Sequence, residues 1–226
     1  MPEQRRYSTS LRAEQTALTR RRILDAAGRL LVERGYHGTT LNGVAEAAEV
    51  SVQTVYNVVG GKAALLKAVY DVTLAGDDEP VPIIERPEFR AAVEATNGRE
   101  CLARYSALGR VLGERTTPLL TVLLAQAAAG DADLAAFVAT IETERSTGTR
   151  NVAMFVAQRF GLRAGLDVDA AADVLWALTA PDLTDRLVVR RGWGWNRFET
   201  WLGATMADAL LGPDGNEFCV IDHAEL

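Results

Sequence analysis

The chain has 226 residues, of which 48% are hydrophobic and 24% charged, an ordinary composition for a folded protein of one or two domains. Two cysteines are too few for a disulfide framework, and the longest apolar run, residues 119–129, is shorter than the roughly 20 residues that cross a bilayer. No charged-then-apolar segment marks export, so we expect a cytoplasmic protein with no membrane partner.

Charge is distributed unevenly along the chain. The net charge is −6, yet residues 1–62 hold nine Arg or Lys against six Asp or Glu, a balance of +3, which leaves −9 for the other 164 residues. A basic start on an acidic body suggests that the two parts meet different partners, the basic part facing a polyanion. The plainer alternative is a basic segment that is only solvated.

The first elements are predicted to be helices. Residues 1–18 are polar, carry three arginines and are predicted to form a flexible basic arm. Thr19 suits the N-cap of a first helix, which shows one apolar face and ends at Gly35. A second, short helix opens at residues 39–40, and its inward side chains are predicted to be Leu41, Val44, Ala45 and Ala48.

A third short helix is predicted after Ser51, whose hydroxyl can cap it. Gly60 and Gly61 end this helix, and a fourth starts at Lys62. The inward residues of the third helix are predicted to be Val52, Val55 and Val59.

The rest of the chain is also helical in pattern. Residues 76–89, rich in proline and acid, are predicted to be a loop near a domain boundary, and residues 213–226 a loose tail. No alternating β-branched run predicts a strand. Helices are predicted at 99–113, 116–129, 132–160, 168–180 and 195–211, with a shorter one near 182–190.

The sequence contains no recognisable catalytic motif. The Gly60-Gly61-Lys62 sequence lacks the earlier glycine and the following hydroxyl of a phosphate-binding loop, since Tyr56 and Ala63 stand at those positions. The two histidines are isolated, and no spacing of His, Cys or carboxylates indicates a metal site. We therefore expect no enzyme activity, no cofactor and no metal.

The second and third helices have the spacing of a helix-turn-helix, with a turn around residues 49–50. Gln53, Thr54 and Asn57 would then offer hydrogen-bond donors and acceptors to base edges. Tyr56 and Lys62 suit phosphate contacts. An ordinary helical bundle with solvated polar residues is the alternative that spacing alone leaves open.

Several short patterns occur together between residues 19 and 71. They are Ile23-x-x-Ala26-Ala27, Gly35-Tyr36, Thr39-Thr40, Val44-Ala45-x-x-Ala48, Val50-Ser51, Thr54-x-Tyr56 and Gly61-Lys62-x-x-Leu65-Leu66. In combination they resemble the DNA-binding domain of the tetracycline-repressor (TetR) family of bacterial regulators. Two positions depart from that pattern: Glu49 stands where the family usually has glycine, and Val59 where it usually has phenylalanine.

The resemblance implies an all-α protein in which an N-terminal three-helix helix-turn-helix domain precedes a larger helical domain for effector binding and dimerisation. The expected division is an arm at 1–18, a DNA-binding domain at 19–66, the larger domain at 67–212 and the tail at 213–226. The candidate DNA-binding residues are Thr40, Asn42, Ser51, Gln53, Thr54, Tyr56, Asn57 and Lys62.

The last helices of the chain resemble those that pair two subunits in the family. An apolar stripe there predicts a dimer interface, although such stripes also form ordinary core. Its candidate residues are Leu175, Leu178, Phe198, Trp201, Leu202 and Thr205. No ligand-binding residues are assigned.

We therefore expect a homodimeric transcriptional regulator, most often a repressor in this family. It would bind a pseudo-palindromic double-stranded DNA operator and be released by a small-molecule effector. The alternative is a small-molecule-binding helical protein without DNA activity.

Overall fold

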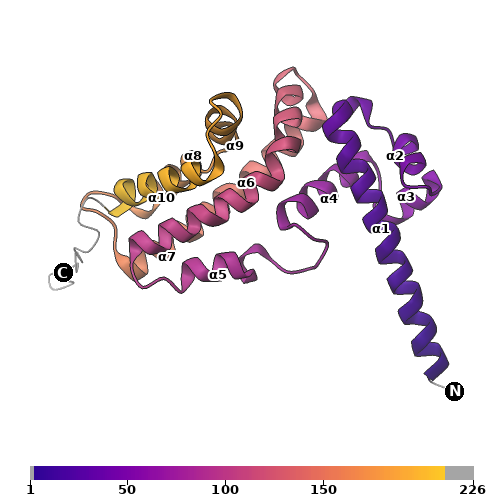
Figure 1. The fold of residues 1–226 in the computed structure, drawn as a ribbon, viewed down its shortest axis with the longest axis horizontal. Helices are drawn as coiled ribbons and strands as arrows, with labels where there is room; N and C mark the ends of the chain where they lie inside the picture. The colour runs from indigo at the N-terminus through magenta and orange to yellow at the C-terminus, as the bar shows by residue number, and fades with distance from the viewer. Residues whose placement is uncertain (1–2, 212–226) are drawn as a thin grey trace, which may run out of the picture. The chain divides into compact units, whose positions relative to one another are not determined.

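The computed structural model describes residues 3–211, with the side chains of residues 14–211, and every regular element in that part of the chain is a helix (Figure 1). The all-α prediction is confirmed. The described part of the chain groups by contact into two compact units: the residues up to Glu79 with 118–138, and residues 80–117 with those from Ala139 onward. The tail predicted at 213–226 lies outside the described residues.

Helix α1 (Glu3–Gly38) begins much earlier than the sequence predicted. Its expected start at Thr19 is wrong, because the Thr19 hydroxyl donates to the Gln15 carbonyl at 2.8 Å, a bond made inside a helix rather than at its cap. The segment predicted as a flexible arm contains no glycine or proline after residue 2 and continues the helix. The helix was expected to end at Gly35; that residue, at φ +70°, interrupts it, and a last turn continues to Gly38.

The first unit holds α1, α2 (Leu41–Ala47), α3 (Val52–Val58) and α4 (Lys62–Ala75). Helices α2 and α3 pack on each other and on α1, and α4 packs along α1 (Figure 1). Their shared core is mostly apolar and includes Ile23, Ala27, Leu31, Val44, Val55, Leu65, Leu66 and Val69. Packing against α1 therefore fixes the short helices, which would be marginal alone.

Residues 118–138 belong to the same unit, although the sequence suggested no such link. They are the end of α6 (Gly98–Ala128) and the start of α7 (Ala132–Phe160). Phe137 meets the Tyr70 ring of α4 edge-on, with the ring centres 5.5 Å apart. Both helices consequently have residues in each of the two units.

Helix α6 is one continuous helix, not the two predicted at 99–113 and 116–129. The Thr116 hydroxyl donates to the Leu112 carbonyl at 2.8 Å and so does not cap a new helix. Pro118 removes one backbone donor just beyond it, but the helix runs on to Ala128.

The second unit begins with a short 3-10 turn, η1 (Ile83–Glu85), inside the region predicted as a loop, and with α5 (Pro87–Val93), which starts in that region and extends beyond it. Pro87 suits the first turn of a helix, where its missing N–H is not needed.

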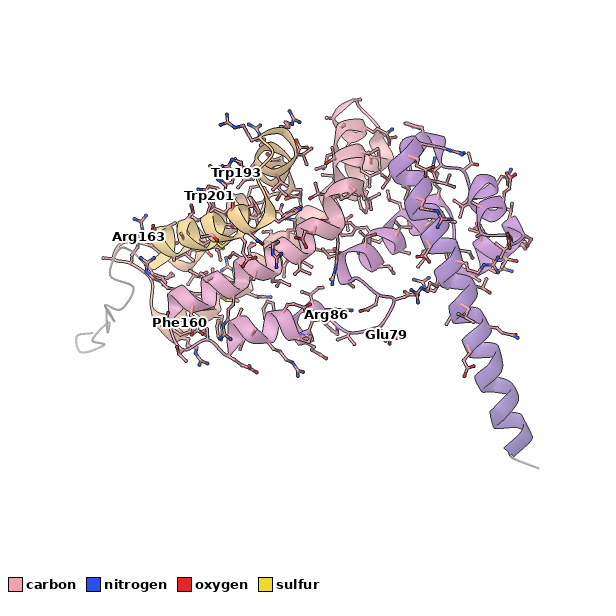
Figure 2. The ribbon with its side chains drawn as sticks, viewed as in Figure 1. Glu79, Arg86, Phe160, Arg163, Trp193 and Trp201 are labelled. Carbon is pink, nitrogen blue, oxygen red and sulfur yellow. The ribbon has the colours of Figure 1, made fainter. Side chains whose placement is uncertain are left out.

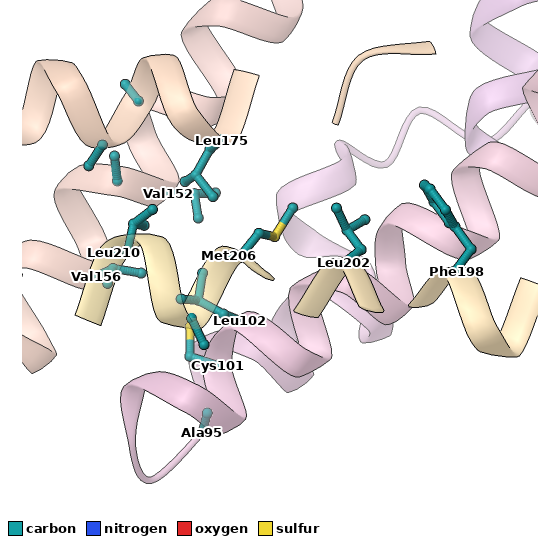
Figure 3. Close-up of a cluster of buried hydrophobic side chains, with 14 residues drawn as sticks. Ala95, Cys101, Leu102, Val152, Val156, Leu175, Phe198, Leu202, Met206 and Leu210 are labelled. Atoms are coloured by element: carbon teal, nitrogen blue, oxygen red, sulfur yellow. The ribbon is translucent and has the colours of Figure 1, made fainter. Parts of the chain in front are cut away.

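The predicted later helices are confirmed as α7, α8 (Val168–Leu178) and α10 (Trp195–Leu211). Between α8 and α10, the predicted short helix is α9 (Pro181–Thr184) followed by a π-helical segment, η2 (Asp185–Arg190). Helices α8 and α10 pack together over a core drawn from α6 and α7 as well (Figure 3). Among the described residues, no helix has both the length and the hydrophobicity needed to cross a membrane.

Candidate nucleic-acid interface

Helix α2 starts at a side-chain cap. The Thr40 hydroxyl accepts a hydrogen bond from the Gly43 N–H at 3.0 Å, as an N-cap residue does. Thr40 and Asn42 are exposed, whereas Val44 and Ala45 on the opposite side are buried. The short helix therefore presents a polar side while its apolar side rests on α1.

The turn between α2 and α3 contains a non-glycine residue in left-handed backbone geometry, Glu49 at φ 54°. This is the position where the sequence departs from the expected glycine. Arg22 of α1 supports the turn, because its Nη2 donates to the Ala48 carbonyl at 2.6 Å and to Glu49 Oε2 at 3.2 Å. The chain thus keeps the turn despite the steric cost of a side chain there.

Helix α3 is held by a cap and by one fully buried side chain. The Ser51 Oγ accepts from the Thr54 N–H at 3.0 Å and lies 2.7 Å from the Thr54 hydroxyl. Val55 is completely buried beneath the helix, as predicted. The predicted inward position of Val52 is wrong: this residue, the first of the helix, is 39% exposed.

The outer side of α3 carries the polar groups that the sequence singled out. Gln53, Tyr56 and Asn57 are exposed, with Tyr56 at 59%. The Gln53 Nε2 donates to the Asn57 Oδ1 at 2.8 Å, so the two amides form one pair on the helix surface. Neither amide is packed inside the protein.

Lys62 opens α4 and is half-buried. Its ammonium lies 4.2 Å from the centre of the Tyr36 ring, a cation–π contact that holds the charge near the start of the helix. Gly61 at the N-cap offers no side chain to the first amides of α4. These amides and the Lys62 charge give the start of α4 a positive electrostatic character.

The end of α1 makes polar contacts that sequence reasoning missed. The Tyr36 N–H donates to the Gln126 Oε1 of α6 at 2.8 Å, and His37 Nε2 lies 2.6 Å from Asp131 Oδ2. Burial raises the pKa of Tyr36, and the nearby carboxylates Asp133 and Asp131 raise it further. No local pattern signals these contacts, because the partners are about ninety positions apart in the chain.

The predicted dimer residues divide into two groups in the structure. Leu175, Phe198 and Leu202 are at most 2% exposed within their own subunit. A side chain buried in its own core has no surface left for a partner, so these three are core residues. Only three of the six are half-buried and keep some surface: Leu178, Trp201 and Thr205.

Trp201 lies in an aromatic group at the start of α10. Its ring meets Trp193 edge-on, with centres 5.7 Å apart, and its centre lies 6.1 Å from that of Phe198. Trp193 and Trp201 are both labelled in Figure 2. The Arg197 guanidinium stands 3.9 Å over the Trp193 ring. Trp176 of α8, which the sequence did not assign to the dimer interface, is 40% exposed, and its ring lies 5.7 Å from the Arg145 guanidinium.

Side chains for metal binding do not gather anywhere between residues 14 and 211: no group of three or more His, Cys, Asp or Glu could hold an ion there. Inside the second unit, burial raises the pKa of Tyr105 to about 12 and that of Cys101 to about 11. Both groups are therefore neutral at physiological pH.

Comparison with known proteins identifies the first unit. Residues 23–69 match the family model described as bacterial regulatory proteins, tetR family. The chain is also 45% identical over 51 residues to an uncharacterized HTH-type transcriptional regulator, YvkB, of Bacillus subtilis (strain 168). That match spans 23% of this chain and 27% of the relative, so it concerns only about a quarter of either protein.

Solved structures extend the likeness of fold to most of the chain. A SmeT–triclosan complex has a TM-score of 0.67 at 22% identity, covering 87% of this chain and 93% of that one. A putative TetR-family transcriptional regulator from Rhodococcus sp. has a TM-score of 0.63 at 18% identity, covering 84% and 96%. The family's domain at residues 23–69 therefore lies in a chain whose fold is shared, over most of its length, with these solved structures.

Proposed function

We propose that this protein is a ligand-responsive transcriptional regulator, most simply a repressor, that binds a pseudo-palindromic DNA operator as a homodimer. The observation that carries the proposal is the outer side of α3. A short helix capped by Ser51 and anchored by Val55 holds Gln53, Tyr56 and Asn57 toward solvent. In a helix-turn-helix, the second helix enters the major groove and its N-terminal part contacts base edges.

The amide pair on α3 has the chemistry to read adenine. With one Gln53 N–H donated to Asn57, the Gln53 oxygen still accepts and the pair still holds donors. Adenine presents an N7 acceptor beside an N6 donor in the major groove, the arrangement that glutamine and asparagine amides bind. Replacing Gln53 should therefore change the preference among sequences more than the affinity for all DNA.

Lys62 and Tyr56 suit contacts with phosphate. The Tyr36 ring restrains the Lys62 ammonium at the start of α4, where the helix dipole also favours an anion. The Tyr56 hydroxyl is a hydrogen-bond donor on a mostly exposed ring. Such contacts strengthen binding to every sequence and make it depend on salt.

The first test is DNA binding by the full-length protein, measured by fluorescence anisotropy on the region upstream of its own gene at several salt concentrations. Lys62→Met should weaken binding to all duplexes and reduce the salt slope by about 1. The matched control is Lys67→Met on the same helix, whose ammonium pairs with Asp71 at 2.5 Å. An unchanged slope in Lys62→Met would remove this residue from the DNA contacts, and no binding by the wild type would reject the proposal.

The homodimer requires a second test. Thr205 keeps exposed surface on α10 beside Trp201, and an arginine there should separate the subunits if this surface pairs them. Sedimentation equilibrium should show a dimer for the wild type and a shift toward monomer for Thr205→Arg. Gln158→Arg, on the exposed side of α7, is the control and should remain dimeric. A wild-type monomer would contradict the dimer and with it the two-half-site operator.

The effector is proposed to act through the second unit. The SmeT complex, which shares the fold, contains triclosan, a small molecule. Because α6 and α7 have residues in both units, a shift of either helix can reach the end of α1 through Gln126 and Asp131. A ligand changes operator affinity only if it binds the two states unequally, and a coupling of about 1–3 kcal/mol corresponds to about 5- to 150-fold.

A further inference from the structure

One apolar side chain lies on the outer side of α3, where the sequence predicted core. Val52 is 39% exposed, while Val55 beneath the same helix is completely buried. With about 100° between successive residues, Val52, Tyr56, Gln53 and Asn57 follow one another across about 140° of the helix surface. Val52 and Tyr56 form one edge of this strip, and the amide pair forms the other.

We infer that Val52 determines sequence specificity by packing against the C5-methyl group of a thymine in the major groove. The inference rests on the proposed DNA binding and adds a residue to it. Val52 is the first residue of α3, and the first residues of a recognition helix are those that reach base edges.

The chemistry of the groove leaves one partner for such a side chain. Guanine, cytosine and adenine show hydrogen-bonding groups in the major groove, and only thymine adds a methyl group. A valine facing polar base edges would remove water from them without replacing the lost hydrogen bonds. Against a thymine methyl, both surfaces leave water, which is favourable.

The contact complements the neighbouring amides. Gln53 follows Val52 directly and belongs to the pair suited to adenine. Together the strip would favour a half-site in which a thymine methyl and an adenine edge lie on adjacent base pairs. Specificity at the thymine would come from shape and burial rather than from a hydrogen bond.

The test removes the methyl group from the DNA and the valine from the protein. A binding site is first selected from random duplexes with the full-length protein, and each thymine is then replaced singly by deoxyuridine, which lacks only the C5-methyl. For the wild type, one position in each half-site should lose about fourfold in affinity, the effect of about one buried methyl. In Val52→Ala, deoxyuridine at that position should have little effect.

Two further variants sharpen the result. Val52→Thr keeps one of the two methyl groups and should keep part of the sensitivity at the same position. Val32→Ala removes an equally exposed valine, 40% exposed on α1, and should leave the wild-type profile unchanged. All three should fold, because neither valine contributes to the core.

The inference and the proposed function fail in different ways. If the wild type binds its selected site but Val52→Ala shows the same deoxyuridine profile, Val52 does not read a methyl, and DNA binding still stands. The role of Val52 is equally refuted if no thymine position responds to loss of its methyl. If the wild type selects no site at all, both proposals are overturned.

Discussion

The turn at Glu49 offers a sharp test of how the helix-turn-helix is built. A residue with a side chain at φ 54° carries a steric cost of about 1–2 kcal/mol that glycine avoids. Against this, glycine lowers the free energy of unfolding by about 0.4–1 kcal/mol relative to alanine, because it gives the unfolded chain more conformational freedom. Glu49→Gly should therefore be more stable than Glu49→Ala by about 1 kcal/mol.

Comparing these two variants with each other removes the ion pair from the calculation. Both lose the contact between the Glu49 carboxylate and Arg22 at 3.2 Å, which is worth little because 85% of the Glu49 side chain is exposed. Both keep the bond from Arg22 to the Ala48 carbonyl. The two variants then differ only in backbone strain and in the conformational freedom of the unfolded chain, and Glu49→Gly should exceed the wild type by a smaller margin, about 0.5 kcal/mol.

The assay is urea unfolding followed by circular dichroism. All four tryptophans lie between residues 176 and 201, outside the helix-turn-helix, so their fluorescence would not report on the turn. Glu46 provides the control: it is exposed within α2, where glycine is less favourable than alanine by about 0.5–1 kcal/mol. The difference in free energy of unfolding between the glycine and the alanine variant should thus have opposite signs at positions 49 and 46. The same sign at both would refute a left-handed Glu49.

Three further predictions concern the cap, the end of α1 and a buried thiol. Ser51→Asp should keep the acceptor for the Thr54 N–H and hence the stability of the protein, whereas Ser51→Ala should lower the free energy of unfolding by about 1 kcal/mol. Fluorescence anisotropy should show weaker DNA binding for Ser51→Asp, because the aspartate adds negative charge. An affinity equal to that of the wild type would place Ser51 away from DNA. Gly35→Ala would place a Cβ 2.8 Å from Gln126 Cδ, so urea unfolding should show a decrease in the free energy of unfolding of more than about 2 kcal/mol. In a Gln126→Ala background the clash is absent, and only the cost of the left-handed backbone, about 1–2 kcal/mol, should remain. Additive effects of the two substitutions would contradict the clash. Burial holds the pKa of Cys101 at about 11 against 9 for an unperturbed thiol, so the folded state binds more protons in this window. The free energy of unfolding should therefore fall as pH rises from about 9 to 11, with a contribution from Cys101 of up to about 1.4 kcal/mol per pH unit. Cys101→Ala should reduce this slope and leave the part that the raised pKa values of Tyr36 and Tyr105 contribute above about pH 10; an unchanged slope would assign it wholly to other groups.

Hydroxyl side chains show where sequence reasoning succeeds and where it stops. Thr40 and Ser51 were predicted at helix starts, and both cap the helices that follow. Thr19 and Thr116 look alike in sequence, yet each donates to the carbonyl four residues earlier inside a longer helix. A cap differs from an internal threonine only in whether the preceding residues are helical, which the residue itself does not encode.

Long-range contacts could not be predicted from the sequence for a different reason. The apolar faces of α1, α2 and α4 follow from local periodicity, so their buried residues were predictable. The hydrogen bond from the Tyr36 N–H to Gln126 joins residues ninety positions apart, and neither residue type indicates such a partner. The same holds for Val52, because periodicity in a seven-residue helix hardly separates an edge position from an inner one.

Internal hydrogen bonds on the candidate DNA surface also bear on specificity. In the free protein Gln53 bonds to Asn57, and Ser51 bonds to Thr54, so these groups are partly satisfied before DNA arrives. Binding a correct site exchanges the amide bond for bonds to a base edge, with a small net gain of about 0.5–1.5 kcal/mol each. A wrong base pair that pulls the amides apart without offering partners costs about 1–3 kcal/mol per unsatisfied group. Discrimination on this surface would therefore come more from penalties at wrong sequences than from gains at the right one, and disrupting the pair with Asn57→Ala should relax specificity before it abolishes binding.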